Sequence, residues 1–311
     1  MTDEPSETLA ASASTMASRI AFAFERQLDM PLAPGLYLVA TPIGHLGDIS
    51  LRALATLAQA DVVYCEDTRH SRTLVAHYAI RATLRPYHEH NAEEQRPRVL
   101  HDLSQGRKVA LISDAGTPLV SDPGFKLVRE AAAAGHSVVA VPGASATLAA
   151  LTVSGLPTDA FFFAGFLPSK EGARKSRIKE LSAVPGTLVF FEAPTRTAAT
   201  LADLAAVLGD RDGVVARELT KLHEDVRRAP LSQLARVFEE APPKGEIVIL
   251  VAPPGETDVS DATIESQLAA AMETLSMRDA VRVVSDNLKV PKAHVYDLAL
   301  ALKKAQRSAD E

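Results

Sequence analysis

The sequence has almost no cysteine. Cys65 is the single cysteine among 311 residues. One cysteine cannot form an intramolecular disulfide, so a small secreted scaffold held together by disulfides is excluded. The hydrophobic fraction of 47% is ordinary for a globular protein and excludes wholesale disorder.

Basic residues are in the minority. The 33 Lys and Arg residues face 39 Asp and Glu residues, which gives a formal net charge of −6. Proteins that bind nucleic acids usually have a basic footprint, so the total charge gives no sign of an RNA or DNA partner. However, both ends of the chain are acidic, and residues 35–257 are nearly neutral. Any RNA contact should therefore depend on a local basic patch and on shape.

No apolar run is long enough to indicate a membrane span. Residues 131–158 contain no charged residue apart from His136, but Pro142 and Gly143 interrupt them. Such a segment is typical of a strand, a turn and a helix inside a core. The N-terminus carries acidic residues where a signal peptide carries Lys or Arg. We therefore expect no membrane partner and a cytoplasmic location.

The length exceeds what one hydrophobic core usually fills, so at least two domains are expected. In residues 35–155, short apolar runs alternate with amphipathic helical patterns, which predicts an α/β domain with a mostly parallel sheet covered on both faces. Residues 156–255 are predicted to form a second α/β domain with a partly antiparallel sheet. Residues 258–311 are predicted to be helical, and residues 1–34 are predicted to be a flexible N-terminal extension.

The C-terminal segment has the features of two short helices. Ser276 and Asp279 form a helix start signal, and Val281, Val284 and Leu288 follow as an apolar stripe. Pro291 is suited to start the next helix. Two helices joined by a tight turn resemble a helix-turn-helix. An appendage for packing or dimerisation explains the pattern equally well.

Glycine and proline gather where the expected strands of the first domain end. Three such loops cover residues 41–48, 113–124 and 141–146. Small residues let a ligand approach the backbone, and in parallel sheets ligands bind at the carboxyl ends of the strands. The sequence has no P-loop and no G-x-G-x-x-G fingerprint, so it does not support an NTPase or an ordinary dinucleotide-binding site.

The segment SDAGTPLVSDPG at residues 113–124 resembles the signature of the ribosomal RNA small subunit methyltransferase I family, within the tetrapyrrole methylase superfamily. Shorter motifs follow in the family's order: TPIG at 41–44, EDTRH at 66–70, PGASA at 142–146, GFLP at 165–168, ARELTK at 216–221 and KGE at 244–246. The resemblance covers residues 35–251, and the C-terminal helices resemble the family's tail. A long block with several collinear motifs is a specific signal.

This resemblance implies two α/β domains with a cofactor cleft between them and a small C-terminal helical domain. It also implies a homodimeric enzyme that uses S-adenosylmethionine to methylate the 2′-hydroxyl of a cytidine in the decoding region of 16S rRNA, in the small ribosomal subunit. The positions that match the family's cofactor contacts are Pro42, Asp114, Gly116, Thr117, Val120, Ser145, Ala146, Phe191 and Gly245.

Methyl transfer to a hydroxyl needs alignment of the reactants and an acceptor for the hydroxyl proton. The candidate acceptors in loops are Glu66, Asp67, Asp114, Glu246 and His45. We expect Glu66 or Asp67 to orient the ribose or accept its proton, and Arg69 to contact phosphate, so these three are the candidate catalytic residues. A structural ion pair that fixes the loop explains this segment equally well.

A local basic patch occurs at residues 169–180, SKEGARKSRIKE, with five basic and two acidic residues. We expect a flexible loop in which Lys170, Arg174, Lys175 and Arg177 hold RNA phosphates; a solvated loop without a partner is the alternative. His88 and His90 lack further ligands at zinc-type spacing, so no metal is expected.

Two other functions are compatible with parts of this pattern. One is a methyltransferase of the same superfamily that acts on a tetrapyrrole or a diphthine-type side chain, against which the SDAGTP and ARELTK motifs argue. The other is a non-catalytic RNA-binding module for ribosome assembly that keeps a vestigial pocket.

Overall fold

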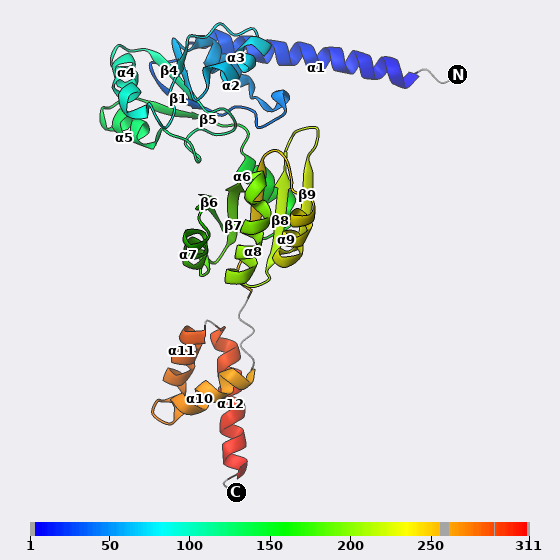
Figure 1. The fold of residues 1–311 in the computed structure, drawn as a ribbon, viewed down its shortest axis with the longest axis vertical. Helices are drawn as coiled ribbons and strands as arrows, with labels where there is room; N and C mark the ends of the chain where they lie inside the picture. The colour runs from blue at the N-terminus through cyan, green and yellow to red at the C-terminus, as the bar shows by residue number, and fades with distance from the viewer. Residues whose placement is uncertain (1–3, 256–260, 289, 310–311) are drawn as a thin grey trace.

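The computed structural model describes residues 4–255, 261–288 and 290–309. It contains two sheet-based domains followed by three helices (Figure 1). Residues 1–3 of the expected extension, and residues 258–260, 289 and 310–311 of the expected helical domain, lie outside the described part. Every helix among the described residues is too short or too polar to span a membrane.

The first domain is built on a five-stranded sheet with the order β3-β2-β4-β1-β5. Its strands are β1 (Gly35–Val39), β2 (Val62–Cys65), β3 (Leu84–Pro86), β4 (Lys108–Ile112) and β5 (Val138–Val141). All neighbouring strands pair in parallel, as expected. The sequence did not predict β3, a short edge strand whose residues are only partly buried. Parallel strands place their carboxyl ends, and the glycine-rich loops that follow them, at one edge of the sheet.

Helices cover both faces of this sheet. They are α2 (Leu51–Gln59), α3 (Thr68–His77), α4 (Ala92–Ser104) and α5 (Phe125–Ala133), with a short 3-10 helix at Leu46–Asp48. Leu57 of α2 packs in the core of one face, while Val99 of α4 and Leu127 of α5 pack in the core of the other. The helix α2 begins after Ser50, whose Oγ accepts a hydrogen bond from the N–H of Ala53. This cap satisfies one of the free N–H groups of the first turn.

The second domain contains a mixed sheet with the order β6-β7-β10-β8-β9. Its strands are β6 (Phe161–Phe166), β7 (Thr187–Glu192), β8 (Asp212–Arg217), β9 (Asp225–Pro230) and β10 (Ile247–Val251). Only β6 and β7 pair in parallel, so the expected partly antiparallel sheet is confirmed. The sequence did not predict β9, because this edge strand, DVRRAP, is largely charged and lacks an apolar alternation.

Helices also cover both faces of the second sheet. They are α6 (Ala146–Ser154), α7 (Glu171–Leu181), α8 (Thr197–Leu208) and α9 (Leu231–Glu240), with a 3-10 helix at Pro194–Arg196. The helices α7, α8 and α9 share one core with the sheet. On the other face, Ala150 and Leu151 of α6 pack with Val214 of β8 and Leu250 of β10. Therefore α6, which directly follows the last strand of the first sheet, is a packing element of the second.

The C-terminal residues form three helices with a core of their own. These helices are α10 (Asp261–Met272), α11 (Met277–Leu288) and α12 (Lys292–Ala309). Ile264, Val284 and Val295 are buried together in this core. The expected helix start is confirmed, because Ser276 Oγ accepts a hydrogen bond from the N–H of Asp279.

The N-terminal segment differs from the expected flexible extension. Glu4–Asp29 forms the helix α1, which projects from the first domain (Figure 1). Its end is fastened to α2: Gln59 Nε2 donates to the carbonyl of Gln27, and Gln59 Oε1 accepts from the N–H of Leu32, each at 3.2 Å. The sequence did not predict this helix because the acidic start and the Ser and Thr residues obscured an alanine-rich segment, and alanine has the highest helix propensity.

Candidate functional site

A cavity of about 420 Å³ lies between the two sheet-based domains. From the loops of the first domain it is lined by Ile43, Glu66, Asp114, Ala115, Gly116, Thr117, Val120, Ser121, Asp122 and Ser145, and from the start of α6 by Ala146 and Thr147. From the second it is lined by Phe166, Phe191, Glu192, Ala193, Pro194, Gly245, Glu246, Ile247 and Val248. The first group follows the carboxyl ends of parallel strands, which is where such sheets bind ligands.

The loop at residues 113–124 forms much of one wall and has an unusual backbone. Leu119 and Ser121 have φ values of 73° and 65°, which residues other than glycine rarely adopt. The neighbouring loops hold it in place: Thr41 and Gly116 exchange backbone hydrogen bonds of 2.9 and 3.1 Å, and Thr117 Oγ1 donates to the carbonyl of Ala144. Strain of this kind persists only where the surroundings enforce it, as at ligand sites.

Most of the residues expected to bind the cofactor are on the wall of this cavity. These are Asp114, Gly116, Thr117, Val120, Ser145, Ala146, Phe191 and Gly245. The structure places Pro42 elsewhere, in a neighbouring cavity of about 290 Å³. The two cavities share Ile43, Asp114, Ala115 and Glu246 on their walls.

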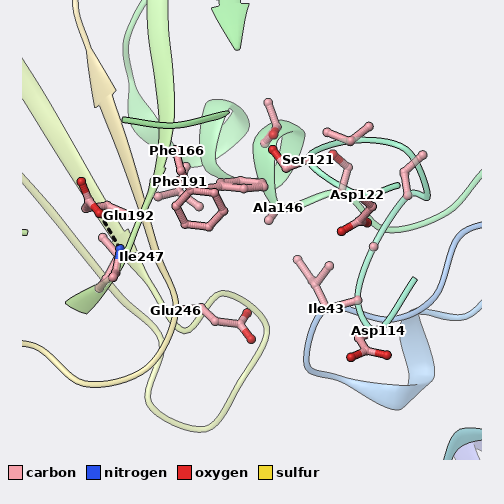
Figure 2. A pocket seen from close by; sticks show the side chains of 18 of the residues that line it. Ile43, Asp114, Ser121, Asp122, Ala146, Phe166, Phe191, Glu192, Glu246 and Ile247 are labelled. Carbon is pink, nitrogen blue, oxygen red and sulfur yellow. Dashed lines mark hydrogen bonds between the residues drawn. The ribbon is translucent and has the colours of Figure 1, made fainter. Parts of the chain in front are cut away.

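Aromatic side chains form the opposite wall. The ring of Phe191 lies edge to face against Phe163 and Phe166, with centroid distances of 4.8 and 5.8 Å. In Figure 2, Phe166 and Phe191 lie on one side of the cavity, and Asp114 and Asp122 lie on the other. The cavity therefore has an apolar wall facing a carboxylate wall.

Gly245 has no room for a side chain. Its φ is +88°, and an added Cβ would lie 2.3 Å from Cδ of Glu218. Glu218 accepts hydrogen bonds from the N–H of Glu246 and from Lys221 Nζ, and these bonds lower the pKa of its carboxyl. Together these contacts fix the KGE segment against the ARELTK segment.

The ARELTK segment also contacts the first loop of the other domain. Thr220 Oγ1 accepts a hydrogen bond from the N–H of His45 at 3.1 Å. A Cβ at Gly44 would lie 2.4 Å from Cγ of Lys221. The second domain thus reaches the TPIG loop directly, and the close approach requires glycine.

Glu66 and Asp122 are the carboxyl groups of the cavity whose protonation is most altered. Burial raises the pKa of Glu66, and the nearby Asp114 raises it further. Burial, followed by the charge of Glu66, raises the pKa of Asp122 to about 6. Sequence reasoning missed Asp122. It lies in the signature segment, at the end where glycine and proline indicated only a turn, and nothing in the sequence reveals its burial.

Asp67 and Arg69 do not line the cavity. Asp67 is the N-cap of α3, and its carboxylate binds the side chain of Arg69 at 2.9 Å. These hydrogen bonds lower the pKa of Asp67 to about 2. The Arg69 side chain is 89% exposed. Of the three candidate catalytic residues, only Glu66 is brought to the cavity, and the Asp67–Arg69 pair fits the alternative of a structural ion pair.

The basic patch at residues 169–180 is not the expected flexible loop. Most of it forms α7, and Arg174 is only 6% exposed. The Arg174 guanidinium binds Asp203 of α8 through Nε and Nη2, at 2.7 and 2.6 Å. Arg174 is therefore unable to hold RNA phosphates. The expectation was wrong because its partner Asp203 is distant in sequence, and a local charge count cannot include it.

The other cations of this helix are less constrained. Lys175 binds Glu171 and also reaches Asp203, and Arg177 binds Glu180. Lys170 is exposed at the N-cap position. Pairing within α7 neutralises much of the expected patch.

Two polar groups near the cavity differ in how they are satisfied. Glu192 is buried and binds Arg196 and Thr200 Oγ1. Thr147 is 5% exposed, and its Oγ1 has no hydrogen-bond partner among the described residues. A buried hydroxyl without a partner is costly unless a ligand or water forms a hydrogen bond with it.

The described residues contain no group of His, Cys, Asp and Glu side chains arranged to hold a metal.

Comparison with known proteins places the chain in a family. Residues 35–235 match the family of Tetrapyrrole (Corrin/Porphyrin) Methylases, and residues 258–303 match the RsmI C-terminal HTH domain. The ribosomal RNA small subunit methyltransferase I of Mesorhizobium japonicum is 50% identical over 282 residues, covering 90% of this chain and 96% of that protein. The protein of the same name from Pseudomonas aeruginosa is 44% identical, covering 85% of this chain and 96% of that one.

Solved structures share the fold at low sequence identity. The uroporphyrin-III C-methyltransferase of Thermus thermophilus, complexed with S-adenyl homocysteine, superposes with a TM-score of 0.51 at 23% identity, covering 70% of this chain and 97% of that chain. A diphthine synthase superposes with a TM-score of 0.55 at 18% identity, covering 70% and 89%. The expected fold of two α/β domains around a cleft is thus confirmed. The chain belongs to the tetrapyrrole methylase family and, within it, to the ribosomal RNA small subunit methyltransferase I proteins.

Proposed function

We propose that this chain transfers the methyl group of S-adenosylmethionine to the 2′-hydroxyl of a cytidine in the decoding region of 16S rRNA, within the small ribosomal subunit. Membership of the methylase family supports methyl transfer as the reaction and S-adenosylmethionine as the cofactor. The names of the curated relatives support small-subunit ribosomal RNA as the substrate. The cytidine and its 2′-oxygen come from the resemblance of the signature at residues 113–124.

The single observation that best supports this proposal is the two-sided wall of the cleft cavity. Its volume of about 420 Å³ lies within the usual range for ligand sites. Phe166 and Phe191 offer apolar surface to an adenine ring. The carboxylates opposite them offer acceptors to ribose hydroxyls and an amino group, and balance the charge of a sulfonium. The unpartnered hydroxyl of Thr147 is available for a further hydrogen bond.

When bound, S-adenosylmethionine supplies an electrophilic methyl group on a sulfur that departs as a neutral thioether. The protein therefore has to align the ribose oxygen and to accept its proton. Alignment contributes about 7–11 kcal/mol in favourable cases, and a positioned base about 10²–10⁴ in rate. Rigid loops such as residues 113–124 and the segment at Gly245 serve the alignment.

We assign the proton acceptor to the carboxylate wall, with Asp122 as the base and Glu66 beside it. A carboxylate whose pKa is raised toward neutrality is a better base than an ordinary one and is still ionised at pH 7.5. Asp67 and Arg69 are assigned a different role: they fix the start of α3, as their mutual hydrogen bonds indicate.

The test is to incubate the purified chain with methyl-labelled cofactor and one of three substrates. These are small ribosomal subunits that lack the modification, naked 16S rRNA, and a tetrapyrrole. We expect label on the subunits, recovered after digestion as 2′-O-methylcytidine. Label on a base would contradict the assigned oxygen, label on the tetrapyrrole would favour the alternative substrate, and cofactor binding without label on any substrate would favour a non-catalytic module.

We further propose that the protein acts as a cytoplasmic homodimer. Support comes from the edge strand β6, where Phe161 and Phe162 are 44% and 39% exposed. Exposed aromatic side chains on a sheet edge are typical of surfaces that a partner covers. Light scattering of the purified chain should give twice the monomer mass, and a monomer mass at micromolar concentration would contradict this.

A further inference from the structure

The first domain contains a second, basic cavity of about 430 Å³. Its charged lining comes from Arg85 of β3, from Arg98, His101 and Asp102 of α4, and from Arg107 just before β4. We call these five residues the arginine hollow. None of the residues that line this cavity lines the cleft. Figure 1 shows α4 at the end of the first domain away from α1.

Asp102 holds two of the arginine side chains of the hollow in place. It is 5% exposed and accepts hydrogen bonds from the hydroxyl of the fully buried Tyr64 at 2.8 Å, from Arg85 Nη1 at 3.1 Å and from Arg107 Nη1 at 2.9 Å. Two guanidinium groups from separate segments are thus held in place by one buried carboxylate. Such pre-organisation reduces the entropy that a ligand would otherwise have to overcome.

The bonds to Asp102 and Tyr64 leave half of each guanidinium available. They use only Nη1 of Arg85 and Nη1 of Arg107. The Nε–Nη2 edges make no bond to another described residue, and the two side chains are 42% and 46% exposed. This edge is the one that binds a phosphate through two parallel hydrogen bonds.

The charge of the hollow exceeds what its structural role requires. Three guanidinium groups and one carboxylate line the hollow. One arginine would balance Asp102, yet Arg85 and Arg107 both bind it. Arg98 adds a third guanidinium that is 62% exposed and whose ion-pair partner, Glu94, is itself 70% exposed and 3.4 Å away. Surface pairs of this kind are weak and readily exchanged for an anion.

We propose that the arginine hollow binds the phosphodiester backbone of the RNA substrate, as an anchor separate from the cleft. This inference rests on the proposed function, because it takes the substrate to be RNA. It also supplies a localised positive charge to a chain that is acidic overall, whereas the buried cation of α7, Arg174, is occupied by Asp203. Arg85 and Arg107 bind phosphate oxygens through their free edges, and Arg98 and His101 extend the contact along the strand.

The test measures binding of the full chain to small ribosomal subunits over a range of KCl concentrations. Arg98→Glu leaves the Asp102 network intact. The triple variant Arg85→Gln, Asp102→Asn, Arg107→Gln removes the buried carboxylate charge together with its partners. Arg236→Glu, at an exposed position on α9, is the control for an equal change of charge. Thermal unfolding identifies any variant that does not fold, and if the triple variant fails, Arg98→Glu decides alone.

Each lost phosphate contact lowers the slope of log affinity against log salt by about 1. We therefore expect the slope to fall by about 1 in Arg98→Glu and by about 2 in the triple variant, with a higher KM for subunits and an unchanged kcat. Arg236→Glu should keep the parent slope. The proposal would be overturned if all variants kept the slope of the parent. It would also be overturned if the variants bound more weakly without a change in slope, which would indicate a contact with a ribosomal protein. If the parent chain methylates no subunits, the proposed function fails first, and the hollow as an RNA anchor fails with it.

Discussion

The carboxyl of Asp122 couples the chemistry of the cleft to its stability. Its pKa lies near 6 because the folded chain half-buries it beside Glu66. A folded-state pKa above the unfolded value of about 3.9 means that the native state binds the proton more tightly. The contribution of Asp122 to stability therefore becomes less favourable as pH rises from about 4 to about 6. Such a cost is expected where a group is held for reaction.

We predict that Asp122→Asn lowers kcat by about 10²-fold, because the proton acceptor is lost, while cofactor affinity changes little. In the parent, kcat should fall as pH drops through about 6, and this limb should disappear in the variant. Methyl transfer under saturating cofactor and subunits, from pH 5 to 8, measures both. The thermal midpoint of the variant at pH 7.5 should be no lower than that of the parent. Full activity with an unchanged pH profile would remove Asp122 from the mechanism.

Gly245 allows a matched test of close packing at the cleft. We predict that Gly245→Ala destabilises the chain by about 2–3 kcal/mol and weakens cofactor binding, since it adds a clash with Glu218 to the strain of a positive φ. Gly135→Ala is the control: its φ is +81°, close to the +88° of Gly245, but no atom lies within 4 Å of the added Cβ. It should cost about 1 kcal/mol and leave cofactor binding intact. Urea unfolding measures the free energy of unfolding, and calorimetric titration measures cofactor affinity. If the two variants changed both quantities equally, the clash with Glu218 would have no role.

At the level of elements, α7 shows how long-range contacts change the meaning of a basic sequence. This helix carries several Lys and Arg residues, yet it packs in the second domain through Ile178 and Leu181, and its buried Arg174 is paired with Asp203. Exposed pairs such as Arg177 with Glu180 contribute little, whereas breaking a buried pair leaves one charge uncompensated.

We predict that Arg174→Met destabilises the second domain by about 3 kcal/mol, at the lower end of the range for buried pairs because Lys175 remains near Asp203. Arg177→Met should change stability by less than about 0.5 kcal/mol. Urea unfolding distinguishes the two. Adding Asp203→Leu to Arg174→Met should restore part of the loss. An Arg174 variant of parent stability with reduced RNA affinity would restore the original expectation for this residue.

The elements that the sequence predicted well are those whose signal is local. The parallel sheet of the first domain and the partly antiparallel sheet of the second match the expected sheets, and Ser276 starts a helix as expected. The edge strands β3 and β9 were missed because their sequences, LRP and DVRRAP, contain neither an apolar run nor an apolar alternation. In the cleft, motif positions such as Thr117 and Gly245 came from the resemblance. Asp122 and the arginine hollow depend on burial and on contacts between distant segments, which local patterns do not contain.

At the scale of the whole molecule, the local distribution of charge matters more than the net charge. The formal charge is −6, yet carboxylates line the cleft between the sheet-based domains, while three arginines line a hollow of the first domain. A net acidic protein can therefore contact RNA if cations are concentrated where the RNA passes. The C-terminal helices, which have a separate core and match a helix-turn-helix domain, offer a further independent surface.

The position of α6 limits how this architecture could be recombined. The loop at residues 142–146 leaves the first sheet and runs straight into α6, which packs on the second sheet, where Arg228 Nε donates to the carbonyl of Ser154. A chimaera joined at residue 155 would separate α6 from the sheet that it covers and pair the pocket with a foreign wall. A functional exchange between related enzymes would have to carry α6 with the second domain, so the natural seam of the molecule lies before Ala146, inside a loop that lines the cleft.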